Sequence, residues 1–365
     1  MTEADTLERK ALSPASCFSL LALVLLGTRF VQGFIFWGGA SRRLFYDFHE
    51  NAGVDFAVKL DFESAGFVAN KLTHALPGSL WIQGPLEWTL QHPDLIIASV
   101  WAWTMAELAV GLGLILGLAT RLAALVSIGL NIALMLIFGW MGSTCLDEWT
   151  MAVSGVAMSS AIFVAGGGTW SLDSLIGRTG WAQRNGWIVW VFSGPLPRAR
   201  VKAYGLFLAA VAVVFTVGSY NILFGAVVSP LHSRVSFHRH DVTLSEVIVS
   251  ADGAVSFGAY VDAGPDTGAA YIIAARLVDD SGATVAEWNG ATLAALPSTA
   301  IRNVYAYVWA SKFKTEKIGF SGQTGARATI TLPPPPVTNA GAGTPQTLVL
   351  EAINGATWQA KATTR

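Results

Sequence analysis

Long apolar runs dominate the N-terminal part of the chain. Each is long enough to cross the hydrocarbon core of a membrane, which takes about 20 residues in a helix. The runs occupy residues 17–39, 95–119, 122–141, 150–169 and 203–228. We therefore predict five transmembrane helices, of which the first four form a bundle. The first run is too long for the apolar part of a signal peptide and lacks a clear small-residue cleavage site, so we interpret it as an uncleaved signal-anchor.

Beyond residue 228 the pattern changes to short segments in which apolar and polar residues alternate, as in "VSFHRHDVTLSEVIVS", "RATITL" and "QTLVLEAI". Alternation with a period of two is typical of strands that bury one face. The pairs Asp252-Gly253, Ser281-Gly282 and Asn354-Gly355 stand at hairpin positions. We predict a small all-β sandwich, so the fold class is a membrane α-helical bundle followed by an all-β domain.

Positively charged residues concentrate on one side of the predicted spans. The loop after the fourth span carries several cations and one acidic residue, namely Arg178, Arg184, Arg198, Arg200 and Lys202 against Asp173. The turn between the second and third spans carries Arg121. Because cytoplasmic loops are enriched in Lys and Arg, these loops and the N-terminus are predicted to be cytoplasmic. We expect Trp140, Trp149 and Trp170, at span ends, to lie at the headgroup level.

This charge pattern and the apolar runs together predict a plasma (inner) membrane protein, with its N-terminus in the cytoplasm and its C-terminal domain outside. Its expected parts are a cytoplasmic N-terminus (1–16), a four-helix transmembrane domain (17–170), a cytoplasmic loop (171–202), a fifth transmembrane helix (203–228) and an extracytoplasmic β-sandwich (229–365).

The composition supports a membrane protein and argues against several other classes. Hydrophobic residues make up 53% of the 365 residues and charged residues only 13%, whereas about a quarter of residues are charged in soluble domains. The net charge of −1 offers no large basic face for nucleic acid. We find no phosphate-binding glycine loop, and no metal, flavin or haem motif. A lipid bilayer is the expected surrounding. Whether the protein forms a homo-oligomer stays open.

Three polar residues interrupt the apolar runs at similar predicted depth. Arg29 is near the middle of the first span, Glu107 of the second and Asn131 of the third. Buried alone, each would be costly, so we expect them to face one another, with Arg29 paired to Glu107. Such a cluster either serves only to hold the bundle together or forms a proton pathway or a quinone site.

The predicted outer segment over residues 40–94 offers cations near the membrane. Arg42 and Arg43 follow the first span, and Tyr46, His49 and Glu50 come soon after. Paired arginines can bind an oxyanion, although arginines that flank a span commonly reach lipid phosphates instead. We expect the remainder of this segment to form short amphipathic pieces that lie on the membrane surface or fold back over the bundle.

The stretch "GWMGSTCLDEWT", between the third and fourth spans, places Cys145 beside Asp147 and Glu148 in a predicted outer loop. Cys17 lies at the opposite end of a span, so the two cysteines are too far apart to form a disulfide. Cys145 is either a small, tolerated side chain or a reactive thiol, since thiols outside the cytoplasm are normally paired unless they have a use.

"FIFWGGASRR", at the end of the first span, and "GWMGSTCLDEW" resemble the DoxD membrane subunit of thiosulfate:quinone oxidoreductase, within a widespread DoxX-like class of four-span bundles. The β-rich tail resembles the partner subunit DoxA, joined in one chain as in DoxDA fusions. The resemblance implies sulfur metabolism: thiosulfate dehydrogenase (quinone) activity, in which two thiosulfates are oxidised to tetrathionate at the periplasmic face and a membrane quinone accepts the electrons.

On these residues we expect a cysteine-centred reaction. Cys145 would carry a covalent thiosulfate adduct, Asp147 and Glu148 would move protons, and a cationic group of Arg42, Arg43 and His49 would bind thiosulfate. Arg29, Glu107 and Asn131 would supply the quinone site or the proton pathway. Two other functions stay open at this point. The chain could be a non-catalytic membrane anchor that displays a β-sandwich binding module, or it could be a transporter.

Overall fold

The computed structural model describes residues 14–44, 62–79, 81–140, 147–179, 184–224, 239–265, 267–305, 308–335 and 346–364. The chain falls into two compact units. The helical unit is drawn from Met1–Asp61, Ala98–Met135 and Asp147–His232, and the β-rich unit from Phe62–Ile97, Leu136–Leu146 and Ser233–Arg365. His49 and Cys145, two of the predicted site residues, lie outside the described residues.

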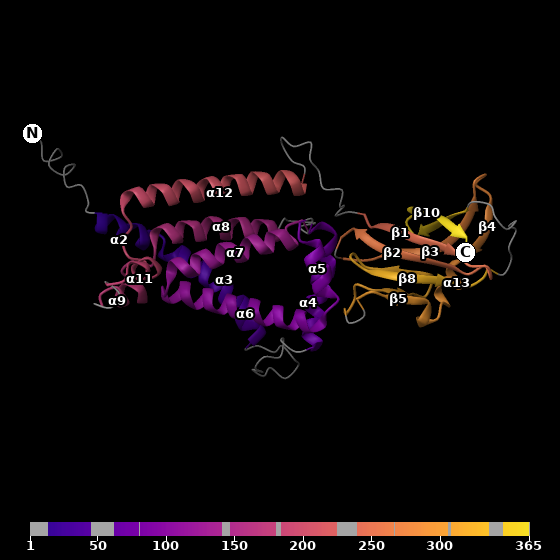
Figure 1. The fold of residues 1–365 in the computed structure, drawn as a ribbon, viewed down its shortest axis with the longest axis horizontal. Coiled ribbons are helices and arrows are strands. Elements are labelled where there is room, and N and C mark those ends of the chain that lie inside the picture. The colour runs from indigo at the N-terminus through magenta and orange to yellow at the C-terminus, as the bar shows by residue number, and fades with distance from the viewer. Residues whose placement is uncertain are drawn as a thin grey trace, which may run out of the picture. The chain divides into compact units, whose positions relative to one another are not determined.

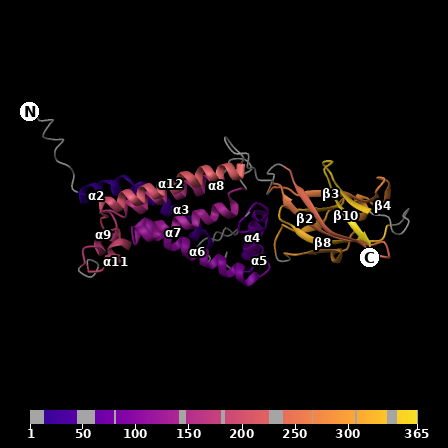
Figure 2. The same ribbon diagram turned by 45° about the horizontal axis from the view of Figure 1, so that its top comes forward.

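Apolar helices make up the helical unit (Figures 1 and 2). They are α2 (Pro14–Val24), α3 (Leu26–Leu44), α6 (Pro93–Leu116), α7 (Thr120–Phe138), α8 (Asp147–Ala165), α9 (Leu172–Ile176), α11 (Gly186–Val191) and α12 (Arg198–Phe224). Within the described residues, four helices are long and apolar enough to cross a membrane, or five if α2 and α3, bent by 48°, form one broken span. The last span begins at Arg198, earlier than the predicted 203.

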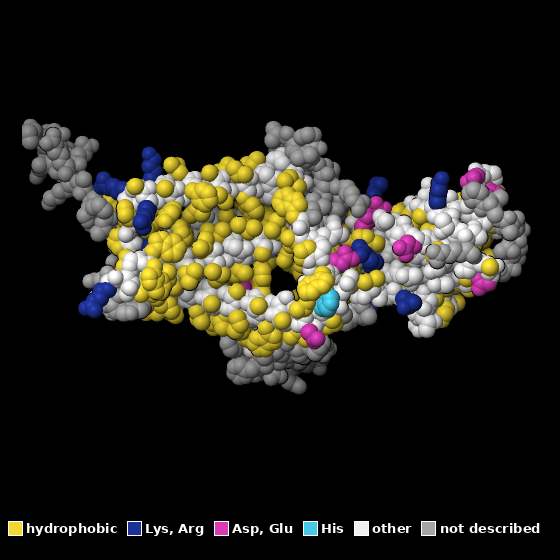
Figure 3. Space-filling model, in the orientation of Figure 1, with side chains coloured by type: hydrophobic (Ala, Val, Ile, Leu, Met, Phe, Trp, Pro, Cys, Tyr) yellow, Lys and Arg dark blue, Asp and Glu magenta, His cyan; other side chains and the backbone are white. Residues whose placement is uncertain are grey.

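The outward faces of these helices suit a lipid environment. Hydrophobic side chains cover the visible face of the helical unit (Figure 3). On α12, Val214 is 71% exposed and Phe207 is 65% exposed, although large apolar side chains are normally buried in proteins that face water. The membrane class predicted from composition is thus consistent with four to five apolar helices.

Small residues allow the helices of the bundle to approach closely. A β-carbon at Gly111 on α6 would lie 2.7 Å from the backbone nitrogen of Trp37 on α3, and one at Gly113 would lie 3.0 Å from the β-carbon of Ala123. Such contacts replace the hydrophobic effect, which is absent between helices in lipid. At the other side of the bundle, Trp149 Nε1 donates a 3.0 Å hydrogen bond to Ser219 Oγ and joins α8 to α12.

In its described residues, the β-rich unit contains ten strands in one continuous sheet, in the order β5-β8-β2-β1-β10-β9-β3-β7-β6, with β4 paired to β3. The strands are β1 (Asp241–Val249), β2 (Val255–Ala263), β3 (Ala270–Asp279), β4 (Thr284–Trp288), β5 (Ile301–Asn303), β6 (Phe313–Thr315), β7 (Phe320–Gly322), β8 (Arg327–Leu332), β9 (Gln346–Ala352) and β10 (Thr357–Thr364). Neighbours are antiparallel except β1 and β10, which pair in parallel.

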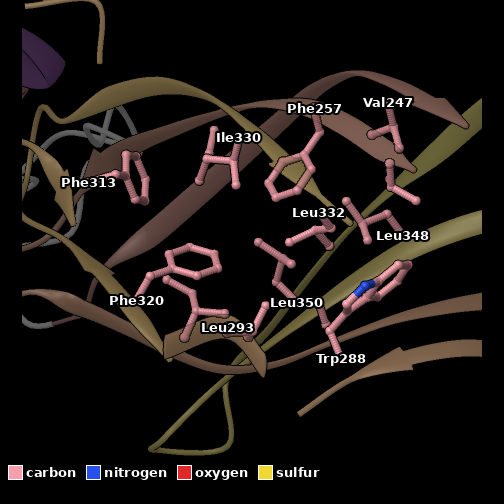
Figure 4. Close-up of a cluster of buried hydrophobic side chains, with 14 of the residues drawn as sticks. Val247, Phe257, Trp288, Leu293, Phe313, Phe320, Ile330, Leu332, Leu348 and Leu350 are labelled. Atoms are coloured by element: carbon pink, nitrogen blue, oxygen red, sulfur yellow. The ribbon is translucent and has the colours of Figure 1, made fainter. Parts of the chain in front are cut away.

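The strands enclose a hydrophobic core, as the close-up shows (Figure 4). Phe257 and Ile330 come from one half of the sheet, and Leu348 and Leu350 come from the other half. All four side chains are fully buried. The predicted all-β domain is confirmed, and its two halves are joined through β1 and β10 into a barrel-like sheet. Gly253, Gly282 and Gly355 have positive φ angles of 86°, 83° and 81°, as tight hairpin turns require.

The segment between the first two spans forms α4 (Phe62–Ala75), a 3₁₀ turn η2 (Leu76–Gly78) and α5 (Gln83–Leu90). We expected these pieces to lie on the membrane or over the bundle, but they belong to the β-rich unit. Asn70 Oδ1 on α4 accepts hydrogen bonds from the backbone N–H groups of Ala310 and Ser311. An amphipathic pattern shows that one face of a helix is buried but does not identify what buries it, so these contacts with the strands could not be predicted.

Trp140, which we expected at the headgroup level of the membrane, packs against the segment between the first two spans. Its side chain is only 2% exposed, and its Nε1 donates a 2.8 Å hydrogen bond to the carbonyl oxygen of Ala75. The ring lies against Gly78, where a β-carbon would overlap it. Trp140 therefore fixes the residues that follow α7 to the end of α4, because a buried indole N–H needs an acceptor.

Candidate functional site

A cluster of polar side chains lies between α3 and α6 in the helical unit. Arg43, in the last turn of α3, forms an ion pair with Glu107 on α6. Its Nε also donates a 2.9 Å hydrogen bond to Thr104 Oγ1. Trp103 Nε1 donates a 2.8 Å hydrogen bond to the other carboxylate oxygen of Glu107. We call Arg43, Trp103, Thr104 and Glu107 the Arg43–Glu107 cluster.

Helix geometry explains how these side chains meet. Trp103 and Glu107 are four residues apart on α6, so they lie one above the other on the same face. Gly39, one turn before Arg43 on α3, leaves room for the carboxylate, because a β-carbon there would lie 2.9 Å from Glu107 Oε2. The side chain of Glu107 is 10% exposed and that of Arg43 is 26% exposed. The pair is therefore largely withdrawn from solvent.

Arg42 points elsewhere. It is exposed, and its Nε donates a 3.0 Å hydrogen bond to the backbone carbonyl of Gly38 within α3. The two arginines predicted to act together thus differ in their surroundings. Arg43 is held by a carboxylate, and Arg42 lies at the surface.

Asn131 belongs to a second group of polar side chains, which joins α3, α7 and α8. Its Nδ2 donates a 2.8 Å hydrogen bond to the carbonyl of Ser127. Ser127 Oγ accepts a 3.0 Å hydrogen bond from Gln32 and lies 2.7 Å from Ser159 Oγ. Gln32, Ser127 and Ser159 were missed in the sequence, because neutral polar residues at helix interiors give a weak signal. The four-residue spacing of Ser127 and Asn131 was the available clue.

Arg29 does not pair with Glu107, contrary to the sequence prediction. Its guanidinium donates hydrogen bonds to the carbonyl oxygens of Gly167 and Trp170, which follow α8. The prediction failed because Arg29 is four turns before Arg43 on α3, whereas Glu107 lies beside Gly39. The equal depth inferred from positions within each apolar run therefore does not describe one shared cluster.

Arg29 instead lies at a capping arrangement around Asp173. The carboxylate of Asp173 accepts hydrogen bonds from the backbone N–H groups of Ala119 and Thr120, at 2.6 and 2.9 Å, and from Ser193 Oγ at 2.6 Å. Arg121, fully buried, donates to the carbonyls of Phe163, Trp190 and Gly194. These contacts hold the turn between α6 and α7 in place. Asp173 and Arg121 therefore have a structural role.

A cavity of about 420 Å³ borders this arrangement. Phe18, Phe192 and Ser174 contribute to its lining, together with Asp173 and Arg178. The cavity lies at the end of the bundle that the charge pattern predicts to be cytoplasmic. We therefore do not assign it to an extracytoplasmic substrate.

The acidic residues near Cys145 occupy the start of a helix. Asp147 is the first residue of α8, and Glu148, half-buried, follows it. Carboxylates are favourable at a helix N-terminus because they complement its positive end. For Glu148, this role is an alternative to the predicted proton transfer. Within the described residues, no group of three or more His, Cys, Asp or Glu side chains is arranged to hold a metal ion.

Two family matches cover most of the chain. Residues 40–199 match the family described as TQO small subunit DoxD, and residues 224–361 match TQO small subunit DoxA. The first match contains α6, α7 and α8 with the Arg43–Glu107 cluster, and the second contains all but the end of the β-rich domain. TQO denotes thiosulfate:quinone oxidoreductase. The chain is therefore a DoxD–DoxA fusion and belongs to the two families of thiosulfate:quinone oxidoreductase small subunits.

Proposed function

We propose that this protein is a thiosulfate dehydrogenase (quinone), which oxidises two thiosulfates to tetrathionate at the outer membrane face and reduces a membrane quinone. The observation that carries the proposal is the Arg43–Glu107 cluster, a charged group held between two apolar helices within the DoxD match. Charged residues inside a membrane bundle are costly and mark functional sites by default.

The overall reaction balances without a further reactant. Each thiosulfate dianion gives up one electron as the sulfur–sulfur bond of tetrathionate forms. The quinone takes both electrons and two protons and becomes the quinol. The protein must therefore bring two dianions together and must conduct two protons to the quinone.

Cations are required for the first task, because like charges repel strongly where water is excluded. The exposed Arg42 is the residue of the predicted pair that is better placed to meet an incoming anion. Arg43 is held by Glu107, so the positive charge of its guanidinium is partly offset. We assign anion binding to Arg42 first, with Arg43 behind it and His49 as a further predicted contact.

For the second task we propose a proton route that includes Asn131 and its neighbours. Serine hydroxyls both donate and accept hydrogen bonds, and the 2.7 Å contact between Ser127 and Ser159 is such a link. Glu107 receives hydrogen bonds from Arg43 and Trp103. We therefore assign to Glu107 the positioning of these two side chains beside the quinone.

The covalent step is proposed for Cys145. The Cys145 thiol and one thiosulfate together lose two electrons to the quinone and one proton, which leaves a Cys–S–S–SO₃⁻ adduct. The second thiosulfate then attacks the sulfur bound to the sulfonate, releases tetrathionate and restores the thiolate. The thiolate regains its proton before the next cycle, and the second proton that the quinol needs comes from solvent through the route above.

The test is a turnover assay with the purified full-length protein in detergent, supplied with thiosulfate and a soluble quinone. We expect one tetrathionate to form for each quinol. Arg42→Gln should raise KM for thiosulfate about tenfold or more, whereas Arg302→Gln, which removes an exposed arginine on β5, should leave KM unchanged. An anchor or a binding module would show no quinone reduction, and a transporter would carry the anion across vesicles without oxidising it.

A further inference from the structure

The DoxD match and the DoxA match meet within the β-rich unit. The helices α4 and α5 belong to the DoxD match, whereas the strands they contact belong to the DoxA match. The β-rich domain is the strand-containing part of the β-rich unit, from β1 to β10, without α4 and α5. We define the α4–α5 interface as the contacts of Phe67, Asn70, His74 and Glu87 with this domain.

The α4 side of this interface is polar and specific. Asn70 Oδ1 accepts hydrogen bonds from two successive backbone N–H groups, of Ala310 at 2.8 Å and of Ser311 at 2.7 Å. His74 Nε2 lies 3.2 Å from Gln323 Oε1. The ring of Phe67 packs against that of Trp309 with centroids 5.5 Å apart. Buried backbone donors need partners, and Asn70 provides them for this loop of the β-rich domain.

The backbones also approach one another closely. At Gly325, with a φ of 84°, a β-carbon would overlap the carbonyl oxygen of Thr73 on α4. Glycine therefore serves two needs at this position, the left-handed conformation and the room for α4. Thr73 itself is fully buried.

The α5 side adds an ion pair. Glu87 pairs with Arg327, the first residue of β8, and accepts a 3.4 Å hydrogen bond from the hydroxyl of Tyr305. The guanidinium of Arg327 lies 4.3 Å from the centroid of the Tyr260 ring. Tyr305, which is 1% exposed, is covered in part by this contact. The charges match across the interface, with the acid on α5 and the base on the strand.

We propose that the α4–α5 interface is the docking site that holds the DoxA-like domain to the DoxD-like region, without help from the covalent link between α12 and β1. Both matched families are described as subunits, so in other proteins the two parts are expected to associate as separate chains. In this chain the α4–α5 contacts join the two matched regions within one polypeptide. The proposal is independent of the proposed reaction.

The experiment uses the full-length protein with a specific protease site inserted between residues 224 and 239, reconstituted in vesicles. After complete cleavage, only non-covalent contacts hold the β-rich domain to the remaining chain. We expect that domain to sediment with the vesicles. Its release into the supernatant from the otherwise unchanged protein would overturn the proposal.

Variants on the DoxD side identify the contacts, because they leave the sequence of the β-rich domain intact. Asn70→Ala combined with Glu87→Gln should release most of the cleaved domain, and release should increase with salt because an ion pair is screened. The matched control is Arg276→Gln, which breaks an ion pair with Glu351 between β3 and β9, inside the domain. It should leave sedimentation unchanged. If the cleaved domain of the Asn70→Ala, Glu87→Gln protein still sedimented fully with the vesicles, other contacts would dock the domain. That result would contradict the proposal.

Discussion

The carboxylate of Glu107 is bound on both sides, by the guanidinium of Arg43 and by the indole N–H of Trp103. The ion pair joins the last turn of α3 to the middle of α6. It links a residue predicted to bind substrate with one predicted to lie on the quinone or proton pathway. The two groups of candidate residues therefore touch at this point.

The first prediction concerns this ion pair. Glu107→Gln or Arg43→Gln alone should lower the stability of the helical bundle by roughly 1 to 3 kcal/mol, because each leaves a charge partly buried without its partner. The double variant should lose less than the sum of the two. Thermal unfolding in detergent measures all three. Arg42→Gln serves as control and should be nearly silent, and strictly additive losses would contradict the pairing.

The second prediction concerns the cap around Asp173. Asp173→Ala removes the acceptor of three hydrogen bonds and should destabilise the bundle by roughly 1 to 3 kcal/mol, since two backbone N–H groups are left unsatisfied. Circular dichroism during unfolding provides the measurement. Arg178→Gln, at an exposed position a few residues on, is the matched control. An unchanged midpoint in Asp173→Ala would show that the cap is dispensable.

The third prediction concerns Cys145. Cys145→Ser keeps nearly the same volume and removes the sulfur nucleophile, so tetrathionate formation should fall to background while the protein stays folded. Intact-mass measurement of the unchanged protein after thiosulfate and quinone should detect the mass of one S–SO₃ group, which is lost on reduction. Cys17→Ser, at an exposed position on α2, should be nearly silent. Substantial turnover in Cys145→Ser would eliminate the covalent route.

The fourth prediction concerns orientation in the membrane. Because the cations concentrate in the loops predicted to be cytoplasmic, a reporter enzyme that works only outside the cytoplasm should be active when fused after Arg365. A second reporter, active only inside, should fail at the same position. The opposite pattern would place the β-rich domain in the cytoplasm and would reverse the proposed side of thiosulfate oxidation.

The fifth prediction concerns alkaline pH. Burial raises the pKa of both Tyr260 and Tyr305 above their ordinary value of 10.0, although neighbouring Arg327 acts in the opposite direction. A raised folded-state pKa favours the neutral tyrosine, so its contribution to stability is complete below pH 10 and is lost as the pH rises above that value. Urea unfolding of the β-rich unit from pH 8 to 11 should detect this loss. Tyr260→Phe should reduce the slope, and an identical slope would contradict the assignment to Tyr260.

Residues with one strong local signal were predicted correctly. The apolar runs located α6, α7 and α8 to within a few residues, because the length of an apolar run is a property of the sequence alone. Alternation and Gly253, Gly282 and Gly355 located the β-rich domain and its turns for the same reason. Cys145 could be selected only by residue type and by the loop in which it was predicted to lie.

Pairings between helices could not be predicted in the same way. Glu107 meets Arg43 and not Arg29, because the partner depends on the rotation of each helix and on where α3 starts relative to α6. The spacing of residues within one helix does not contain that information. The polar group around Ser127 was missed for a related reason, since serine becomes significant only when Gln32 and Ser159 are brought against it.

The sequence by itself therefore determined the membrane class, the β-rich tail and the family resemblance, all of which rest on local patterns of residue type. Only the tertiary structure decided that Arg43 holds Glu107, that Arg29 lies with Asp173 at the turn between α6 and α7, and that α4 and α5 belong with the strands. These relationships join residues far apart in the chain. They are set by close packing and by the need of each buried polar group for a partner, which act only once the chain has folded.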